Sequence, residues 1–207
     1  MAILHESFIR AHARQRATTR GSSVEDELLR VSGLQNSHYD IFLSQTIRDA
    51  EIVLGVYDLL TEAGHAVFCD WINSPESDRA SVTPANAEFI RGQMTASDCL
   101  LFLDTENADQ SFWMCWEIGW FDGAKGHVAV LPVLADGHNC YRGREFLGLY
   151  PYVEADEKGH LKIVRPSATN RHGVTLIEAP NSTSFDQWRT GSPSLMRPKL
   201  IEHWKPW

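Results

Sequence analysis

A single carboxylate stands among aromatic side chains in the stretch SFWMCWEIGWFDG, residues 111–123. On a helix, Trp113 and Glu117 would share a face because they are four residues apart, and Phe112, Trp116 and Trp120 would form a neighbouring stripe. One interpretation places Glu117 in the wall of an aromatic cleft, where a ring could stack a flat or cationic heterocycle. The other places the stripe in the core and Glu117 on the surface.

Common motifs of phosphate binding and nucleophilic catalysis do not occur in the sequence. There is no G-x-G-x-x-G, no G-x-x-x-x-G-K-[ST] and no G-x-S-x-G. None of the four cysteines forms a C-x-x-C pair, and no histidine or cysteine cluster has the spacing of zinc ligands. We therefore expect reduced thiols in a cytoplasmic protein, with no metal and no cofactor.

The charge and the apolar pattern exclude some classes of partner. The 207-residue chain has a formal net charge of −8, which argues against broad nucleic-acid binding. The arginines near the N-terminus could still form a local basic patch; they are Arg10, Arg14, Arg16 and Arg20. No apolar run approaches the length of a membrane span, and the N-terminus has no signal-peptide pattern, so we expect no membrane partner.

Strand-like and helix-like segments alternate from residue 39 onward. Short apolar runs at 39–44, 65–70, 99–104 and 127–133 predict strands, and helical spacing predicts helices at 48–63, 84–97 and 111–123. This alternation predicts an α/β fold with a doubly wound parallel sheet, in which ligands bind beyond the carboxyl ends of the strands. Those ends fall at 44–47, 70–79 and 105–111.

Further segments flank this alternation. Residues 5–18 predict a helix ended by Gly21, and Ser22 with Glu25 predicts a capping box that opens a second helix to about residue 31. After residue 135, the runs 146–155 and 160–166 predict a hairpin or an edge pair of strands, and 182–189 predicts a short helix. We expect an N-terminal helical extension (1–37), one α/β domain (38–135) and a C-terminal extension (136–207) packed on that domain.

Several segments taken together resemble a TIR domain, the Toll/interleukin-1 receptor fold, which is flavodoxin-like. YDIFLSQTIRDAE (39–51) is similar to its first strand and turn, VFCDW (67–71) to its second strand, and the polar loop that follows stands where the BB loop does. SDCLLFLDTENADQSFWMCWEIGW (97–120) is similar to the third strand and the S-x-W-x-x-x-E segment, here Ser111, Trp113 and Glu117. The fuller patterns at 78–84 and 113–123 resemble stand-alone bacterial TIR proteins of antiphage defence.

The resemblance implies an enzyme that cleaves the bond between nicotinamide and ribose in NAD+, with Glu117 as the catalytic residue. Nicotinamide is cationic in NAD+ and leaves as a neutral molecule, so no general acid is needed. One carboxylate can then orient the ribose hydroxyls and stabilise the oxocarbenium-like transition state. The resemblance implies substrate contacts for Trp113, Ser44, Thr46, Asp70, Trp71, Arg79 and Ser111.

The resemblance leaves the product and the partners open. Capture of the ribosyl cation by water gives ADP-ribose, whereas capture by an adenine nitrogen or a ribose hydroxyl gives a cyclic ADP-ribose. Assembly into a homo-oligomer on activation is implied, as is a regulatory or effector protein partner. Gln45, Thr46 and Ile47 stand where enzymatic relatives often carry aromatic or basic residues, and the segment after residue 135 lies outside the resemblance.

Two other functions remain open at this point. One is a non-enzymatic TIR interaction module, as in many receptor and adaptor proteins. The other is an enzyme that cleaves the glycosidic bond of nucleosides or nucleotides other than NAD+, for which a similar α/β fold and a lone glutamate would also serve.

Overall fold

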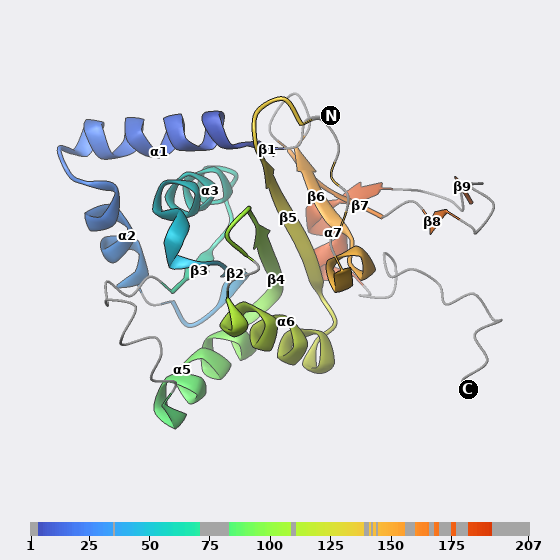
Figure 1. Cartoon of the computed structure of the whole chain (residues 1–207). Coiled ribbons are helices and arrows are strands. Elements are labelled where there is room, and N and C mark those ends of the chain that lie inside the picture. The colour runs from blue at the N-terminus through green and yellow to red at the C-terminus, as the bar shows by residue number, and fades with distance from the viewer. Residues whose placement is uncertain are drawn as a thin grey trace.

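The protein is built around one large mixed sheet with helices on both faces (Figure 1). The computed structural model describes residues 4–34, 36–70, 83–108, 111–138, 141, 143, 145–155, 160–165, 168–169, 175–176 and 182–191. The strands of the large sheet are β1 (Leu4–His5), β2 (Tyr39–Ser44), β3 (Val67–Cys69), β4 (Ser97–Asp104), β5 (Val128–Leu134), β6 (Tyr152–Ala155), β7 (Leu161–Val164) and β10 (Ser182–Ser184). A separate pair joins β8 (Ala168–Thr169) to β9 (Thr175–Leu176).

Half of the described helices connect successive parallel strands. They are α1 (Glu6–Arg20), α2 (Val24–Ser32), α3 (Ala50–Glu62), α5 (Pro84–Thr95), α6 (Phe112–Ala124) and α7 (Phe185–Thr190), with short 3-10 turns η1 (Ile47–Asp49) and η3 (Glu145–Leu149). In the part of the chain that the structure describes, no helix has the length and apolar character that crossing a bilayer requires.

The strand order confirms the predicted doubly wound α/β fold. The parallel strands lie in the order β3-β2-β4-β5-β6, which is 2-1-3-4-5 when they are counted along the chain from β2. This is the flavodoxin-like order, and its switch point lies between β2 and β4, where connections leave to opposite sides. The carboxyl ends of those two strands are therefore the place to look for a ligand site.

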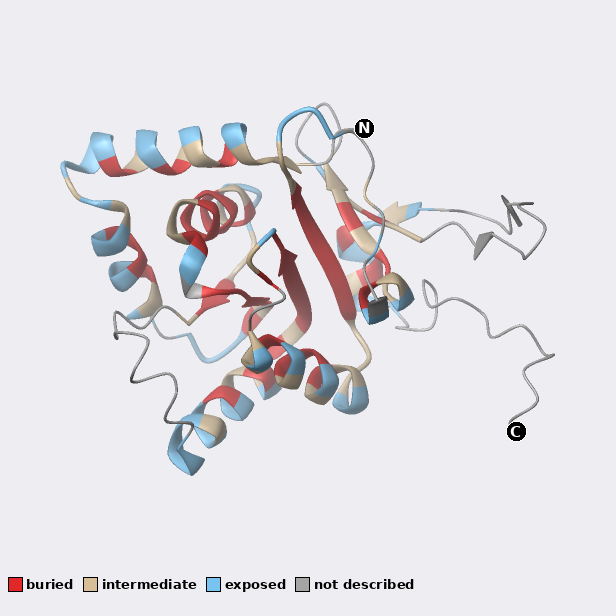
Figure 2. Ribbon diagram, in the orientation of Figure 1, coloured by how far each residue is buried: buried red, intermediate tan, exposed pale blue. Residues whose placement is uncertain are grey.

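Two separate cores cover the two faces of the sheet. Side chains of α1, α2, α3 and α7 pack on one face, and side chains of α5 and α6 pack on the other. Successive side chains of β4 point to opposite faces of the sheet. Leu101 and Leu103 therefore pack in the first core, while Leu100 and Phe102 pack in the second. Figure 2 shows the central strands buried along most of their length, as expected for a sheet covered on both sides.

The N-terminal segment is joined to the sheet and to α3. Leu4 and His5 pair in parallel with Val133 and Leu134 at the end of β5, and α1 then crosses α3. The crossing is close at Gly55, where a Cβ atom would lie 2.3 Å from the carbonyl oxygen of Ile9. A side chain at position 55 would therefore force the two helices apart.

The start of α2 differs from the prediction by one residue. The capping box is formed by Ser23 and Asp26. Ser22 still belongs to the end of α1, because its backbone N–H donates to the carbonyl of Ala17 after the left-handed Gly21. The Ser22 side chain instead donates to Glu27.

The N-terminal arginines lie beside carboxylates and do not form a separate basic patch. Arg10 and Arg14 contact Glu51, and Arg16 contacts Glu27 and Asp58. Arg20 also contacts Glu27.

The segment after β5 continues the large sheet. β6 and β7 form the predicted antiparallel hairpin, and β10 adds a further antiparallel strand. Two details differ from the sequence prediction: residues 146–149 belong to the 3-10 turn η3, and residues 182–184 form a strand before the short helix α7 begins. Phe185 and Trp188 of α7 are buried against the sheet, which fixes this helix in place.

Candidate active site at the switch point

Ser44 and Glu117 meet at the switch point of the sheet. Ser44 is the last residue of β2, and its Oγ donates a hydrogen bond of 2.5 Å to Oε2 of Glu117 on α6. Ser44 is 1% exposed and Glu117 is 4% exposed. A buried carboxylate is costly unless hydrogen bonds compensate for its lost hydration, so this contact is part of what holds the anion there. The structure thus brings together two of the residues that the sequence predicted.

The burial of Glu117 follows from which stripe of α6 faces the sheet. Met114, Ile118 and Phe121 pack in the core, and Glu117 falls in the same stripe because its spacing from them is three, one and four residues. Ser111 caps this helix, since its Oγ accepts the N–H of Met114 at 3.3 Å. The interpretation of Glu117 as a surface carboxylate is therefore wrong.

The tryptophans of α6 are partly buried and lie at the edge of the core. Trp113 and Trp116 are half-buried, with ring centroids 4.9 Å apart, and Phe112 is 94% exposed. The guanidinium of Arg91 lies 5.5 Å from the centroid of the Trp116 ring. Trp113 lies one turn before Glu117 on α6, and its ring is partly exposed.

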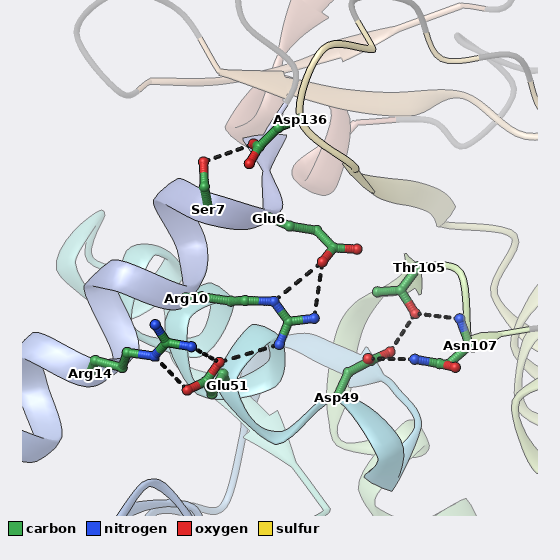
Figure 3. Close-up of polar contacts among 9 residues, drawn as sticks. All are labelled: Glu6, Ser7, Arg10, Arg14, Asp49, Glu51, Thr105, Asn107 and Asp136. Atoms are coloured by element: carbon green, nitrogen blue, oxygen red, sulfur yellow. Dashed lines mark hydrogen bonds and ion pairs between the residues drawn. The ribbon is translucent and has the colours of Figure 1, made fainter.

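A second polar group joins the loops that follow β2 and β4 (Figure 3). Asp49, which is 3% exposed, accepts 2.5 Å and 2.8 Å hydrogen bonds from Thr105 Oγ1 and Asn107 Nδ2. The N–H of Asn107 in turn donates to Thr105 Oγ1. The two loops at the switch point are thereby held together. These residues were not singled out from the sequence, although polar side chains in the loops that follow two parallel strands were a usable signal.

Arginines of helix α1 form ion pairs beside the switch-point loops. Arg10 contacts both Glu6 and Glu51, and Arg14 donates to Glu51 at 2.6 Å and 2.9 Å. The hydrogen bond from Arg14 lowers the pKa of Glu51, with Arg10 adding to the effect against the opposing influence of burial. Glu51 is two residues from Asp49, so these ion pairs hold the first turn of α3 beside the switch-point loops (Figure 3).

The segment after β5 also reaches the carboxyl ends of the strands. Tyr141 donates a 3.0 Å hydrogen bond from its hydroxyl to Oδ2 of Asp104, the last residue of β4. The Tyr141 ring packs on Tyr152 with centroids 5.4 Å apart. Neither Asp104 nor Tyr141 was identified from the sequence. The segment that lies outside the TIR resemblance therefore contributes to this edge of the sheet.

The remaining predicted substrate contacts are distributed around the same edge. Thr46 is buried directly after β2, and the carbonyl of half-buried Asp70 accepts a 2.5 Å hydrogen bond from Gln45 Nε2. This contact ties the loop after β2 to the start of the loop after β3. Trp71 and Arg79 lie outside the described residues.

Within the described ranges, one group of side chains has the geometry of a metal site. It lies at the end of the sheet opposite the Ser44–Glu117 pair. His38, Asp40 and Asp98 offer ligand atoms within 4.8 Å of one another, near the amino ends of β2 and β4. Arg189 of α7 already donates to both carboxylates, at 2.6 Å and 2.5 Å. The two carboxylates therefore hold α7 against the end of the sheet opposite Glu117 through their contacts with Arg189.

Comparisons with known proteins give one informative relative. No protein-family model matches the chain. A protein of Bacillus cereus (strain MSX-D12) named "Probable 3' cyclic ADP-D-ribose synthase ThsB'" is 44% identical over 120 residues. Over these 120 residues the chain is similar to a protein named as a probable cyclic ADP-ribose synthase. The match covers 58% of this chain and 62% of the relative, so the chain spans less than two thirds of that protein.

Proposed function

We propose that this protein is a bacterial TIR-type enzyme that cleaves the nicotinamide–ribose bond of NAD+ and closes the product into a cyclic ADP-ribose. The observation that carries the proposal is the buried pair of Ser44 and Glu117 at the switch point of a flavodoxin-like sheet. The similarity to a cyclic ADP-ribose synthase supports the choice of a cyclase over a simple hydrolase, and its name favours closure at the 3′ position.

The proposed reaction uses Glu117 as an anion placed beside the reacting ribose. The bond from the anomeric carbon to the nicotinamide nitrogen breaks, and its electron pair stays on the nitrogen, so nicotinamide leaves uncharged. Glu117 stabilises the positive charge that develops on the ribose, and its burial strengthens this effect because little water screens it. Ser44 holds the carboxylate in one orientation through the 2.5 Å hydrogen bond.

The other predicted residues take supporting roles in this proposal. Trp113 shapes the pocket or stacks the nicotinamide ring. Thr46 contacts ribose or phosphate from the first turn, and Ser111 lies at the start of α6. Asp70, Trp71 and Arg79 border the pocket from the side of the BB loop, with Arg79 on a phosphate.

The wider setting is also part of the proposal. Residues 38–135 form the catalytic domain, with 1–37 and 136–207 as extensions that support it. The protein acts in the cytoplasm in antiphage immunity and assembles into a homo-oligomer on activation. A protein partner either regulates it or responds to its product. NAD+ is its substrate, no further cofactor takes part, and nucleic acid and membranes are not its ligands.

The test compares substrates and products for the full chain at high concentration with a crowding agent. NAD+, free nucleosides and nucleotides are incubated with the parent, with Glu117→Gln and with Glu25→Gln, a control at an exposed glutamate of α2. We expect nicotinamide and a cyclic ADP-ribose from the parent and the control alone. Cleavage of free nucleosides without cleavage of NAD+ would instead identify the alternative glycosidic-bond enzyme. Turnover of no substrate, even after addition of infected-cell lysate, would indicate an interaction module.

A further inference from the structure

The outer face of α6 is an exposed surface without charge. Phe112 is 94% exposed at the start of the helix, and the residues exposed further along it are Cys115, Gly119, Gly123 and Ala124 (Figure 2). All 13 residues of α6 lie in the part of the chain that the structure describes, and none of its exposed residues is charged. A helix on the surface of a soluble protein normally presents charged side chains to water. This face therefore has the composition of the centre of an interface.

The two halves of this face differ in shape. Phe112 projects at one end, whereas Gly119 and Gly123 carry no side chain in the other half. A Cβ atom built at either glycine would meet no neighbouring atom within 4 Å, so the surface above both glycines is open. Gly119 lies about two turns and about 10 Å along the helix axis from Phe112, on the same side of the helix. A ring at one end and open backbone at the other make this face complementary to itself.

A second copy of the chain fits this face in an antiparallel arrangement. Cys115 and Trp116 lie midway between Phe112 and Gly119 in the helix. A two-fold axis at this midpoint brings Phe112 of one copy over Gly119 of the other, and the same axis repeats the contact in the opposite sense. The ring can approach closely because glycine leaves the backbone bare. The antiparallel arrangement also places the positive end of each helix dipole beside the negative end of the other.

We propose that two copies of this chain associate through the outer face of α6, with Phe112 of each copy packed over Gly119 of the other. This inference rests on the homo-oligomer of the proposed function and names the surface that forms it. Trp116 borders the face, and the guanidinium of Arg91 on α5 lies 5.5 Å from its ring centroid, so α5 flanks the interface. Because α6 also carries Glu117, association at this face acts on the helix that bears the proposed catalytic group.

The size of the face predicts a weak association. A helix of this length is about 20 Å long and about 10 Å wide, so its face covers roughly 200 Å² per copy. A stable interface covers about 800 Å² per partner, and Phe89 of α5, which is also exposed, supplies only part of the difference. The net charge of −8 on each copy also opposes association. We therefore expect monomers in dilute solution and dimers at high concentration, as suits a protein that assembles on activation.

The experiment measures self-association of the full chain by sedimentation velocity, without NAD+, from about 5 μM to about 500 μM. We expect the parent to dimerise within this range, and Phe112→Ser and Gly119→Gln each to raise the dissociation constant at least about tenfold. Gly119→Gln should also raise the melting temperature of the monomer, because glutamine favours a helix more than glycine does. Phe8→Ser and Ala11→Gln are matched controls at exposed positions of α1, which packs on the other face of the sheet. They should keep the parent dissociation constant.

The results separate this inference from the proposed function. A dimer that Phe112→Ser and Gly119→Gln leave intact would overturn the α6 surface, while the homo-oligomer would stand. A parent that stays monomeric throughout would overturn the inference and would leave a different protein as the partner for this face. Equal weakening in the controls would also overturn it, because the effect would not be specific to α6. If circular dichroism shows that Phe112→Ser does not fold, Gly119→Gln decides. A parent that dimerises through α6 without releasing nicotinamide from NAD+ would refute the catalytic proposal alone.

Discussion

Replacing Ser44 with alanine tests whether the buried hydrogen bond to Glu117 matters for turnover. The substitution removes one hydroxyl from a residue that is 1% exposed, and it leaves the Glu117 carboxylate in place without this donor. No charge changes, and a serine-to-alanine change creates little empty space. We therefore expect the fold to be retained and the effect to appear in the chemical step.

The expected size of the effect follows from the type of hydrogen bond. A hydrogen bond to a charged group contributes about 1.5–3 kcal/mol, and about 1.4 kcal/mol corresponds to a tenfold change in rate. If the bond to Ser44 holds Glu117 in its reactive orientation, Ser44→Ala should lower kcat by roughly 10- to 150-fold. KM for NAD+ should change little, because the lost contact is to the carboxylate.

The assay is nicotinamide release at steady state in two backgrounds. In the parent, Ser44→Ala should give the full loss. In Glu117→Asp, which keeps a carboxylate but shortens its reach to Ser44, it should give less than about a twofold further loss, since the two residues act as a unit. Ser97→Ala is the matched control. Ser97 is equally buried, its Oγ donates to the Gln93 carbonyl at 2.8 Å, and it lies at the opposite end of β4 from the site.

Two results would refute this reasoning. One is a turnover rate for Ser44→Ala within twofold of the parent. The other is the same loss in both backgrounds, which would mean that Ser44 acts independently of Glu117. An equal loss in Ser97→Ala would show that the effect comes from general destabilisation of the sheet.

Three further substitutions test contacts that hold the fold together. Gly55→Ala places a Cβ atom 2.3 Å from the Ile9 carbonyl oxygen, so urea denaturation should show a loss of about 1–3 kcal/mol, and an unchanged midpoint would contradict the close crossing. Burial opposes ionisation of Glu27, but hydrogen bonds and arginine charges outweigh it and lower its pKa. Its stabilising contribution is therefore present at neutral pH and is lost as the pH falls below about 4, so Glu27→Gln should be less stable at pH 7 and should lose less stability on acidification than the parent. Asp49→Asn weakens the contact with Thr105 and should lower both the unfolding free energy, by about 1.5–3 kcal/mol, and kcat; equal denaturation curves would contradict it.

The order of elements could be predicted from the sequence because each central segment carries its own signal. The apolar runs at 39–44 and 99–104 became β2 and β4, and the capped, periodic run at 111–123 became α6. Alternation of these segments was enough to predict a doubly wound sheet and the edge at which a ligand would bind.

The face of α6 that packs on the sheet could not be predicted from its pattern. The helix carries large apolar side chains on all sides, so its periodicity does not say which stripe is buried. The structure buries Met114 and Ile118 and leaves Phe112 exposed. Its aromatic surroundings made Glu117 conspicuous, but only the resemblance to a TIR motif gave it a catalytic role. The contact of Glu117 with Ser44, 73 positions earlier in the chain, depends on the whole order of the strands.

Contacts between distant segments explain the other omissions. Asp49 and Thr105 are 56 residues apart, and Asp104 and Tyr141 are 37 apart. Each of these residues is unremarkable in its local sequence, and only the strand order brings the members of each pair together. The contacts of Arg189 on α7 with Asp40 and Asp98 also join segments far apart in the sequence, so they were not predicted.

The most direct test of the central claim is nicotinamide release from NAD+ by the assembled parent and by Glu117→Gln, with the second product identified by mass spectrometry. Our proposal predicts equal amounts of nicotinamide and a cyclic ADP-ribose from the parent, and release from Glu117→Gln reduced to the background rate. Nicotinamide release that persists in a folded Glu117→Gln would contradict the assignment of the buried carboxylate as the catalytic group.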